Sequence, residues 1–363
     1  MRRVGYYKLT RPKGQAADWV WIIDHTIQLG ARKCLVILGV RLSALPPPGT
    51  CLRQEDVEPI ARYPVQTSTG DVGYPPLTAA MAHTGVPREI LSDGGSDLQA
   101  GIAQCPQAHP EPPAIYDIKH KTALVLKHAL ADDPLWPAFP QQAAQTKQRV
   151  PQTPLAFVAP PPQRRKARAM NGDLLIRWGT KVLAYLAPPR RTAAHAVTAE
   201  QLATAYGGLP DFRAPLHDCS ALPQIVEPTE HWGRSQGLSP GCARALTPQV
   251  TPLVRTGRGQ RVAHHVLSFV ETEAAKAAPH ERLLGSSEVI ESVFGKLNRL
   301  EQHQARSGFP GLVLAVGALV APYADNRNSS SSCALRAVRL RSLRHPKVCL
   351  KVRKNTSMPQ RAV

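Results

Sequence analysis

The chain has 363 residues and carries 45 Lys and Arg residues against 26 Asp and Glu residues, a net charge of +19 at neutral pH. Its 43% hydrophobic and 20% charged residues exclude disorder throughout and leave enough apolar side chains for a folded core. The positive charge favours a polyanion as partner, most commonly nucleic acid, although a generally basic proteome would leave the same bias.

Neither the cysteines nor the apolar segments indicate export or a membrane. The seven cysteines include no CxxC pair and no metal-ligand spacing with a histidine, so we expect a reducing cytoplasm and no disulfide framework. The N-terminus lacks the apolar core of a signal peptide. The most apolar tract, residues 311–321, has 11 residues, fewer than the roughly 20 that a membrane helix needs. We therefore expect a soluble protein without a membrane partner.

The first third of the chain predicts an α/β fold that starts from a hairpin. Residues 19–42 predict two strands joined by a tight turn, with Asp24 inside the first strand. The following segments predict a loop with at most short strands over 43–76, a helix over 77–83, a strand over 89–91, a helix over 97–104, a strand over 114–117 and then a helix. This alternation of strands and helices is typical of an α/β sheet.

The rest of the chain is richer in proline and predicts mostly helices and loops. Residues 173–186 have helical spacing, whereas residues 227–250 fit no regular element. The segment 286–304 is the clearest helix, with Ser286 or Ser287 as its cap and one apolar stripe. From residue 326 the chain carries ten Lys or Arg residues and no acid, which predicts a disordered basic tail.

Asp24 and Asp93 are the first two acids that could form a site. A carboxylate inside a central strand is costly unless it is paired or bound to a metal, although a strand-end acid is the more ordinary interpretation of Asp24. Asp93 lies where a predicted strand meets a Gly-Gly turn, and open α/β sheets place their sites at such strand ends. A plain turn aspartate is the alternative there, and Asp97 remains an alternative acid.

The third acid lies on the helix predicted over residues 286–304. Glu291 lies nearer the apolar stripe than Glu288 does, so a helix packed by its stripe points Glu291 toward the sheet more easily. The choice between the two stays open, as does a solvated role for either. An Asp on the first strand, an Asp after a later strand and a Glu on a late helix follow the order of a two-metal carboxylate site, which holds Mg²⁺ or Mn²⁺.

Four segments resemble the DDE transposases of bacterial insertion sequences. They are WVWIIDHTIQLG, EILSDGGSDLQAGI, YDIKHKTALVLKHAL and LLGSSEVIESVFGKLNRLEQHQARSGF. The resemblance implies an RNase H-like mixed sheet flanked by helices, with a largely helical insertion before the last acid. It also implies that Asp24, Asp93 and Glu291 are catalytic and bind Mg²⁺ or Mn²⁺. The reaction would be DNA cleavage and strand transfer by two-metal chemistry. The protein would be bacterial, cytoplasmic and nucleoid-associated, and its partners would be transposon ends, target DNA and a second copy in a homodimer.

The same resemblance implies several DNA-binding residues. Asp117 and His120 match a motif in which an acid or Cys is followed three positions later by His, which helps to position flanking DNA. Lys296 and Arg299 follow Glu291 on its helix, where a basic residue contacts the DNA backbone; both could equally be solvated. The run Arg164, Arg165, Lys166 and Arg168 is a candidate phosphate contact on charge grounds, or a flexible basic loop.

The expected domain organisation has five parts. They are a remnant over 1–17, the first part of the core over 18–133, an insertion over 134–280, the final core helices over 281–324 and the tail over 325–363. Only 23 residues precede Asp24, so the N-terminal region that recognises element ends is expected to be missing. Together with the irregular stretch at 227–250, this suggests a truncated or decayed copy. The alternatives are a non-catalytic basic DNA-binding remnant and an RNase H-like nuclease that does not join strands.

Overall fold

The fold is taken from a computed structural model that describes residues 2–29, 32–65, 70–104, 113–163, 171–187, 197–302 and 309–320. The predicted basic tail, 325–363, lies outside these residues. Within them, no helix is both long and apolar enough to cross a membrane.

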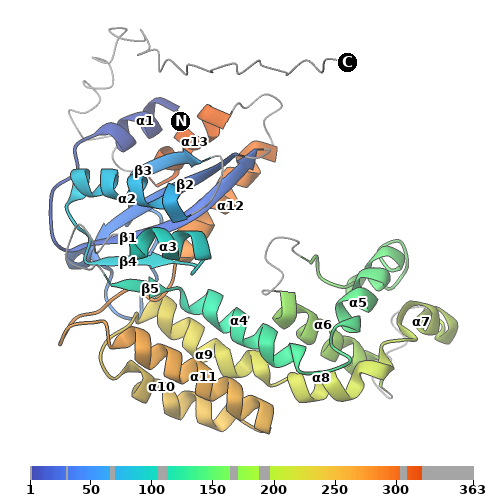
Figure 1. The fold of residues 1–363 in the computed structure, drawn as a ribbon. Helices are drawn as coiled ribbons and strands as arrows, with labels where there is room; N and C mark the ends of the chain where they lie inside the picture. Colours follow the sequence, from blue (N-terminus) through green and yellow to red (C-terminus); the bar gives the residue numbers. More distant parts are fainter. Residues whose placement is uncertain are drawn as a thin grey trace, which may run out of the picture. The chain divides into compact units, whose positions relative to one another are not determined.

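A five-stranded mixed sheet forms the centre of the fold (Figure 1). Its strands are β1 (Trp19–Leu29), β2 (Arg32–Arg41), β3 (Glu58–Val65), β4 (Glu89–Ser92) and β5 (Ala114–Tyr116). They lie in the order β3-β2-β1-β4-β5, in which the pairs β1–β2 and β2–β3 are antiparallel and the pairs β1–β4 and β4–β5 are parallel. Helices flank this sheet, so the expected mixed sheet with flanking helices is confirmed.

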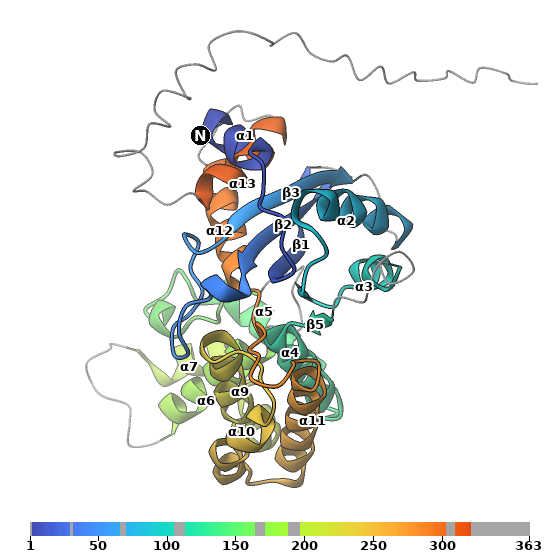
Figure 2. The same cartoon turned by 90° about the vertical axis from the view of Figure 1, so that its left-hand side faces the viewer.

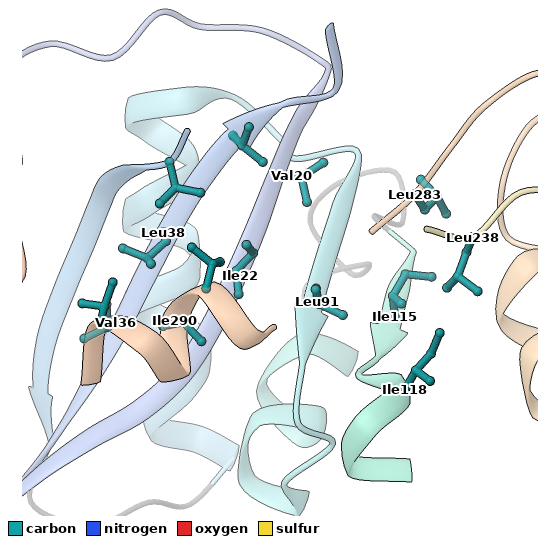
Figure 3. Packing of buried hydrophobic residues seen from close by; sticks show 14 of the residues in the cluster. Val20, Ile22, Val36, Leu38, Leu91, Ile115, Ile118, Leu238, Leu283 and Ile290 are labelled. Carbon is teal, nitrogen blue, oxygen red and sulfur yellow. The ribbon is translucent and has the colours of Figure 1, made fainter. Parts of the chain in front are cut away.

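Successive side chains of β1 point to opposite faces of the sheet, and each face is covered by different helices. Trp19, Trp21 and Ile23 pack with α2 (Gly70–Thr84) and α3 (Ser96–Ala103). Val20 and Ile22 belong to one buried cluster with residues of α12 (Glu288–Gln302) and α13 (Phe309–Leu319). Figure 2 shows where the two helices lie, and Figure 3 shows Ile290 of α12 beside Ile22. The period of two along β1 thus decides which residues meet α12.

The described residues between β5 and α12 are mostly helical. Its helices are α4 (Ile118–Ala131), α5 (Ala138–Arg149), α6 (Asn171–Leu186), α7 (Ala199–Tyr206), α8 (Arg213–Cys219), α9 (Leu222–Ser235), α10 (Cys242–Val250) and α11 (Gly257–Ala274). Two hydrophobic clusters of their own hold them together. Leu238, Leu246 and Val270 also join the core on the α12 face of the sheet. The helical insertion before the last acid is therefore present.

Two predictions about regular structure are wrong, and proline explains both. Residues 43–76, expected as a loop with at most short strands, contain the eight-residue β3 and the start of α2. β3 carries Pro59 and Pro64 but lies at the edge of the sheet, where a missing N–H costs little. The irregular stretch 227–250 forms parts of α9 and α10, which tolerate Pro228 and Pro248 because their apolar faces are buried. Because residues 227–250 form regular helices, this segment does not support the interpretation of the chain as a decayed copy.

The N-terminal residues expected as a remnant form part of the packed structure. Helix α1 (Arg2–Thr10) lies against α13. The two backbones approach so closely that a Cβ added to Gly5 would lie 1.8 Å from the carbonyl oxygen of Leu314. Only glycine fits at this crossing, so the helix pair is specified by sequence.

Candidate active site

The register between β1 and β4 places Asp24 next to Asp93. Ile23 of β1 pairs with Ser92 of β4 in parallel register, so the residue after each is level with its neighbour. Adjacent strands lie about 4.8 Å apart, and side chains of paired residues in parallel strands point to the same face. The two carboxylates are therefore neighbours, on one face of the sheet.

That face is the one covered by α12. Ile22, Leu91 and Ile290 belong to one buried cluster on this side of the sheet, where Figure 3 shows Ile290 beside Ile22. Asp24 and Asp93 follow Ile22 and Leu91 by two residues, the repeat of a strand. Asp93 also accepts a hydrogen bond from the backbone N–H of Gly95 at 2.9 Å, which shapes the Gly-Gly turn. The strands thus aim both acids toward the helix that carries Glu291.

Asp24 is the most perturbed carboxyl of this group. It is half-buried and lies inside β1, paired with Val36 of β2, as the sequence predicts. Burial raises the pKa of Asp24 to about 8, and the negative charges of Asp93 and Glu291 add to this rise. The backbone hydrogen bond from His25 and the charge of His120 oppose it. Asp93 and Glu291 are therefore each close enough to act on the charge of Asp24.

Asp117 ends the next strand and holds two helices at once. One oxygen, Oδ1, accepts hydrogen bonds from the backbone N–H of His120 at 2.8 Å and from its Nδ1 at 3.1 Å. The other, Oδ2, accepts from the backbone N–H of Ser287 at 2.6 Å and from its hydroxyl at 2.9 Å. Burial opposes ionisation, but these hydrogen bonds and the charge of His120 outweigh it and lower the pKa of Asp117. Asp117 is 1% exposed, and its predicted role in positioning DNA stays a prediction.

His120 lies between Asp117 and Glu291. Its Nε2 is 3.8 Å from Oε1 of Glu291. Burial lowers the pKa of His120, but the hydrogen bond and charge of Asp117, with the charges of Glu291 and Asp93, raise it to about 9. At neutral pH the ring is therefore an imidazolium beside the acids, and its side chain remains 28% exposed. This cation can meet a substrate anion.

Lys119 joins the two candidate glutamates of α12. Its Nζ is 3.1 Å from Oε1 of Glu288 and 3.3 Å from Oε2 of Glu291. Burial lowers the pKa of Lys119, but the charges of Glu291 and Glu288 outweigh it and raise the value. Both acids thus lie on the same side of α12. Glu291 is the one that also approaches His120 and acts on Asp24, which favours it over Glu288.

The acids suit a hard divalent cation by their chemistry, since Mg²⁺ and Mn²⁺ prefer carboxylate oxygens. Burial, and after it the charges of Asp93 and Glu291, raise the pKa of Asp24, and a bound cation would favour its ionised form. In the described part of the chain, however, no three His, Cys, Asp or Glu side chains are arranged to hold a metal ion. Glu291 forms an ion pair with Lys119. This ion pair would have to break before Glu291 could bind a metal ion.

The remaining predicted residues lie in different places. Asp97 is in the first turn of α3, and its side chain falls outside what the structure describes, as do Arg164, Arg165, Lys166 and Arg168. Lys296 and Arg299 are exposed on α12, and the Nζ of Lys296 contacts the side-chain oxygen of Gln54.

Lys119 and Ser287 belong to the site, although the sequence did not predict either as a member of it. Lys119 lies between Asp117 and His120 in the sequence, two residues that were predicted to belong to the site. This neighbourhood is the signal from which Lys119 could have been predicted. Ser287 was expected only as a helix cap, whereas its hydroxyl and N–H bind a buried carboxylate of another element.

No protein-family model matches the sequence, and no curated protein matches it. Among solved structures, the Drosophila P element transposase strand transfer complex is similar with 10% sequence identity and a TM-score of 0.41. The alignment covers 91% of this chain and 84% of that chain. A likeness of this size supports no statement about function, which must follow from the side chains of the site.

Proposed function

We propose that this protein is a metal-dependent DNA transposase of the DDE type, as the resemblance to bacterial insertion-sequence enzymes implies. One observation carries the proposal. Asp24 and Asp93 directly follow a pair of residues on two parallel strands, and the charges of Asp93 and Glu291 add to the burial that raises the pKa of Asp24. Acids are seldom gathered in this way without a cation to offset them.

Asp24, Asp93 and Glu291 would hold the metal ions, Mg²⁺ or Mn²⁺. When bound, such ions activate a water or a 3′-hydroxyl and stabilise the leaving oxygen of a phosphodiester. Asp24 lies inside a strand that is paired on both sides, whereas Asp93 lies just beyond the end of β4. It would therefore supply the fixed point of the site, whereas Glu291 would exchange Lys119 for the metal.

The cations around the acids would bind the substrate. The imidazolium of His120 would contact a phosphate of the DNA strand, because the ring is partly exposed and is held in place by Asp117. Once released from Glu291, the ammonium of Lys119 would lie beside the same phosphate. Asp117 would act as a positioning residue, since it fixes the beginnings of α4 and α12 without reaching the surface.

A nicking assay on supercoiled plasmid DNA, with and without Mg²⁺ or Mn²⁺, tests the proposal. We expect metal-dependent nicking that falls to background in Asp24→Asn, Asp93→Asn and Glu291→Gln. The matched controls Asp211→Asn and Glu271→Gln replace exposed acids outside the site and should keep full activity. Nicking that is equal in all variants would refute the proposal.

Two further outcomes would replace the proposal by a different function. Tight DNA binding without nicking would indicate a non-catalytic DNA-binding protein of the same fold. Nicking without any joining of a labelled donor end to target DNA would indicate an RNase H-like nuclease. In each case the affinity for DNA should fall steeply with salt, because Lys and Arg residues displace counterions from phosphates.

A further inference from the structure

A groove of about 380 Å³ opens beside the candidate active site. Three separate parts of the chain form its walls: the loop that precedes β3, the last turn of α9 and the exposed side of α12. Glu288 belongs to this wall and shares Lys119 with Glu291. The groove is therefore linked to Glu291 through Lys119, although none of the three predicted acids lines it.

The floor of the groove is built by Gln54. This side chain is 8% exposed; its Nε2 donates to the hydroxyl of Ser292 at 2.7 Å, and its Oε1 accepts from Lys296. A buried carboxamide thus pins the loop to α12 and holds an ammonium group at the groove. Because the carboxamide is neutral, the contact orients Lys296 without cancelling its charge.

Cations reach the groove from all three walls. Arg53 comes from the loop and Arg234 from α9, with side chains that are 69% and 43% exposed, and Lys296 comes from α12. The acids present are Glu55, at 3.7 Å from Arg53, and Glu288, at 3.5 Å from Arg234. Exposed pairs at such distances are weak, and Glu288 is shared with Lys119, so the groove keeps a positive surplus.

We propose that this groove binds the phosphodiester backbone of the DNA strand next to the scissile phosphate. The inference rests on the proposed function and names the path of its substrate. A strand whose phosphate lies at the acids must continue across the surface beside α12, and the groove offers cations from three elements along that path. Arg53, Arg234 and Lys296 would contact successive phosphates, while the hydroxyl of Ser292 offers a further polar contact.

The groove contains its own reporter in Cys51, an exposed free thiol on its wall. The experiment measures the rate of maleimide modification of Cys51 in the full chain by peptide mass spectrometry, without divalent metal. A single-stranded oligonucleotide at a saturating concentration should slow the reaction at least five-fold. Inorganic phosphate at millimolar concentration should leave the rate unchanged. Equal protection by phosphate would overturn the assignment to a strand, and no protection by DNA would overturn the groove.

Substitutions supply the second readout. Arg53→Gln, Arg234→Gln and Lys296→Gln should each weaken oligonucleotide binding roughly five- to ten-fold at about 0.1 M salt and reduce the salt slope by about 0.7. Arg261→Gln, at a side chain 61% exposed on α11, is the matched control and should change neither. Weakening by the control alone would place the strand elsewhere and refute the proposal.

Protection of Cys51 and oligonucleotide binding are measured without catalysis. The proposed groove and the proposed transposase activity can therefore be refuted separately. Metal-dependent nicking with no protection of Cys51 would remove the groove and leave the enzyme. Protection of Cys51 with no nicking under any metal would keep the groove as a nucleic-acid site and remove the transposase.

Discussion

The carboxylate of Asp117 accepts two hydrogen bonds from Ser287, one from its backbone N–H at 2.6 Å and one from its hydroxyl at 2.9 Å. Asp117 is also the N-cap of α4, and Ser287 immediately precedes α12. One buried carboxylate therefore fixes the start of both helices. Because His120 and Glu291 each lie about one turn further along, the contact sets their relative position.

Replacing Asp117 by Ala should destabilise the fold strongly. The change removes the acceptor of four hydrogen bonds and leaves buried N–H groups of His120 and Ser287 without a partner. We expect the free energy of unfolding to fall by about 3–5 kcal/mol, measured by urea denaturation. Asp211→Ala, at an exposed position, is the control. A loss below about 1 kcal/mol, the size of an ordinary cap, would contradict the dual role.

Replacing Asp24 by Asn should stabilise the metal-free protein. Burial and the charges of two neighbouring acids oppose ionisation of Asp24, whose pKa is about 8, and an amide avoids this cost. We expect a gain of about 2–4 kcal/mol in the free energy of unfolding at pH 8.5, where the folded carboxyl is largely ionised. Millimolar Mg²⁺ should raise the melting temperature of the wild type but not that of Asp24→Asn. A variant less stable than the metal-free wild type would show that Asp24 is satisfied by protein contacts.

Glu89 should make the free energy of unfolding depend on pH, and this dependence should persist when metal ions are bound. Its side chain is fully buried; one oxygen accepts from the N–H of Leu284 at 3.0 Å, and the other has no hydrogen-bond partner among the described residues. Burial raises the pKa of Glu89 from 4.5 to about 8. Since the folded pKa exceeds the unfolded one, its contribution to stability is full below pH 4.5 and is lost as pH rises through about 8.

The variant Glu89→Gln tests this contribution. It should match the wild type near pH 4.5 and exceed it by several kcal/mol near pH 9, because the amide cannot ionise. Thermal unfolding across this range, with Mg²⁺ present to offset Asp24, separates the two carboxyls. Glu271→Gln on the exposed side of α11 should leave the pH profile unchanged. Parallel profiles for Glu89→Gln and the wild type would mean that Glu89 is not protonated in the fold.

Lys119 should compete with metal for Glu291. Its ammonium is 3.3 Å from that carboxylate, so a metal ion must displace it and also meets its positive charge. We expect Lys119→Met to lower the Mg²⁺ concentration at half-maximal thermal stabilisation roughly ten-fold, a change of about 1.4 kcal/mol. Lys127→Met, on the exposed side of the same helix, should have no effect. An unchanged or higher Mg²⁺ requirement would show that Lys119 orients Glu291 for the metal instead.

The sequence predicts the parts of the fold that local patterns specify. The alternation in β1 and β2 indicates the hairpin with Asp24 inside it, and the apolar stripe with its serine caps indicates α12. The prolines of β3 and α9 misled the prediction, because their cost depends on whether an element lies at an edge or buries a face. That information resides in the tertiary structure and not in the local sequence.

Of the residues in the candidate site, only the acids could be predicted from local sequence patterns. Asp24 and Asp93 follow predicted strands, but their adjacency depends on the parallel register of β1 with β4, which no local pattern specifies. The ion pairs of Lys119 and the hydrogen bonds between Asp117 and Ser287 join residues that are far apart in the chain. They depend on how α12 docks on the sheet, so they could not be inferred from spacing.

The most direct test of the central claim is X-ray diffraction from crystals of the protein soaked in Mn²⁺, with the anomalous signal of the ion recorded. We predict anomalous peaks within coordination distance of the Asp24 and Asp93 carboxylates, with Glu291 turned from Lys119 toward the metal, and we predict that Asp24→Asn crystals lose them. Crystals at saturating Mn²⁺ that show no ion between Asp24 and Asp93 would contradict the account.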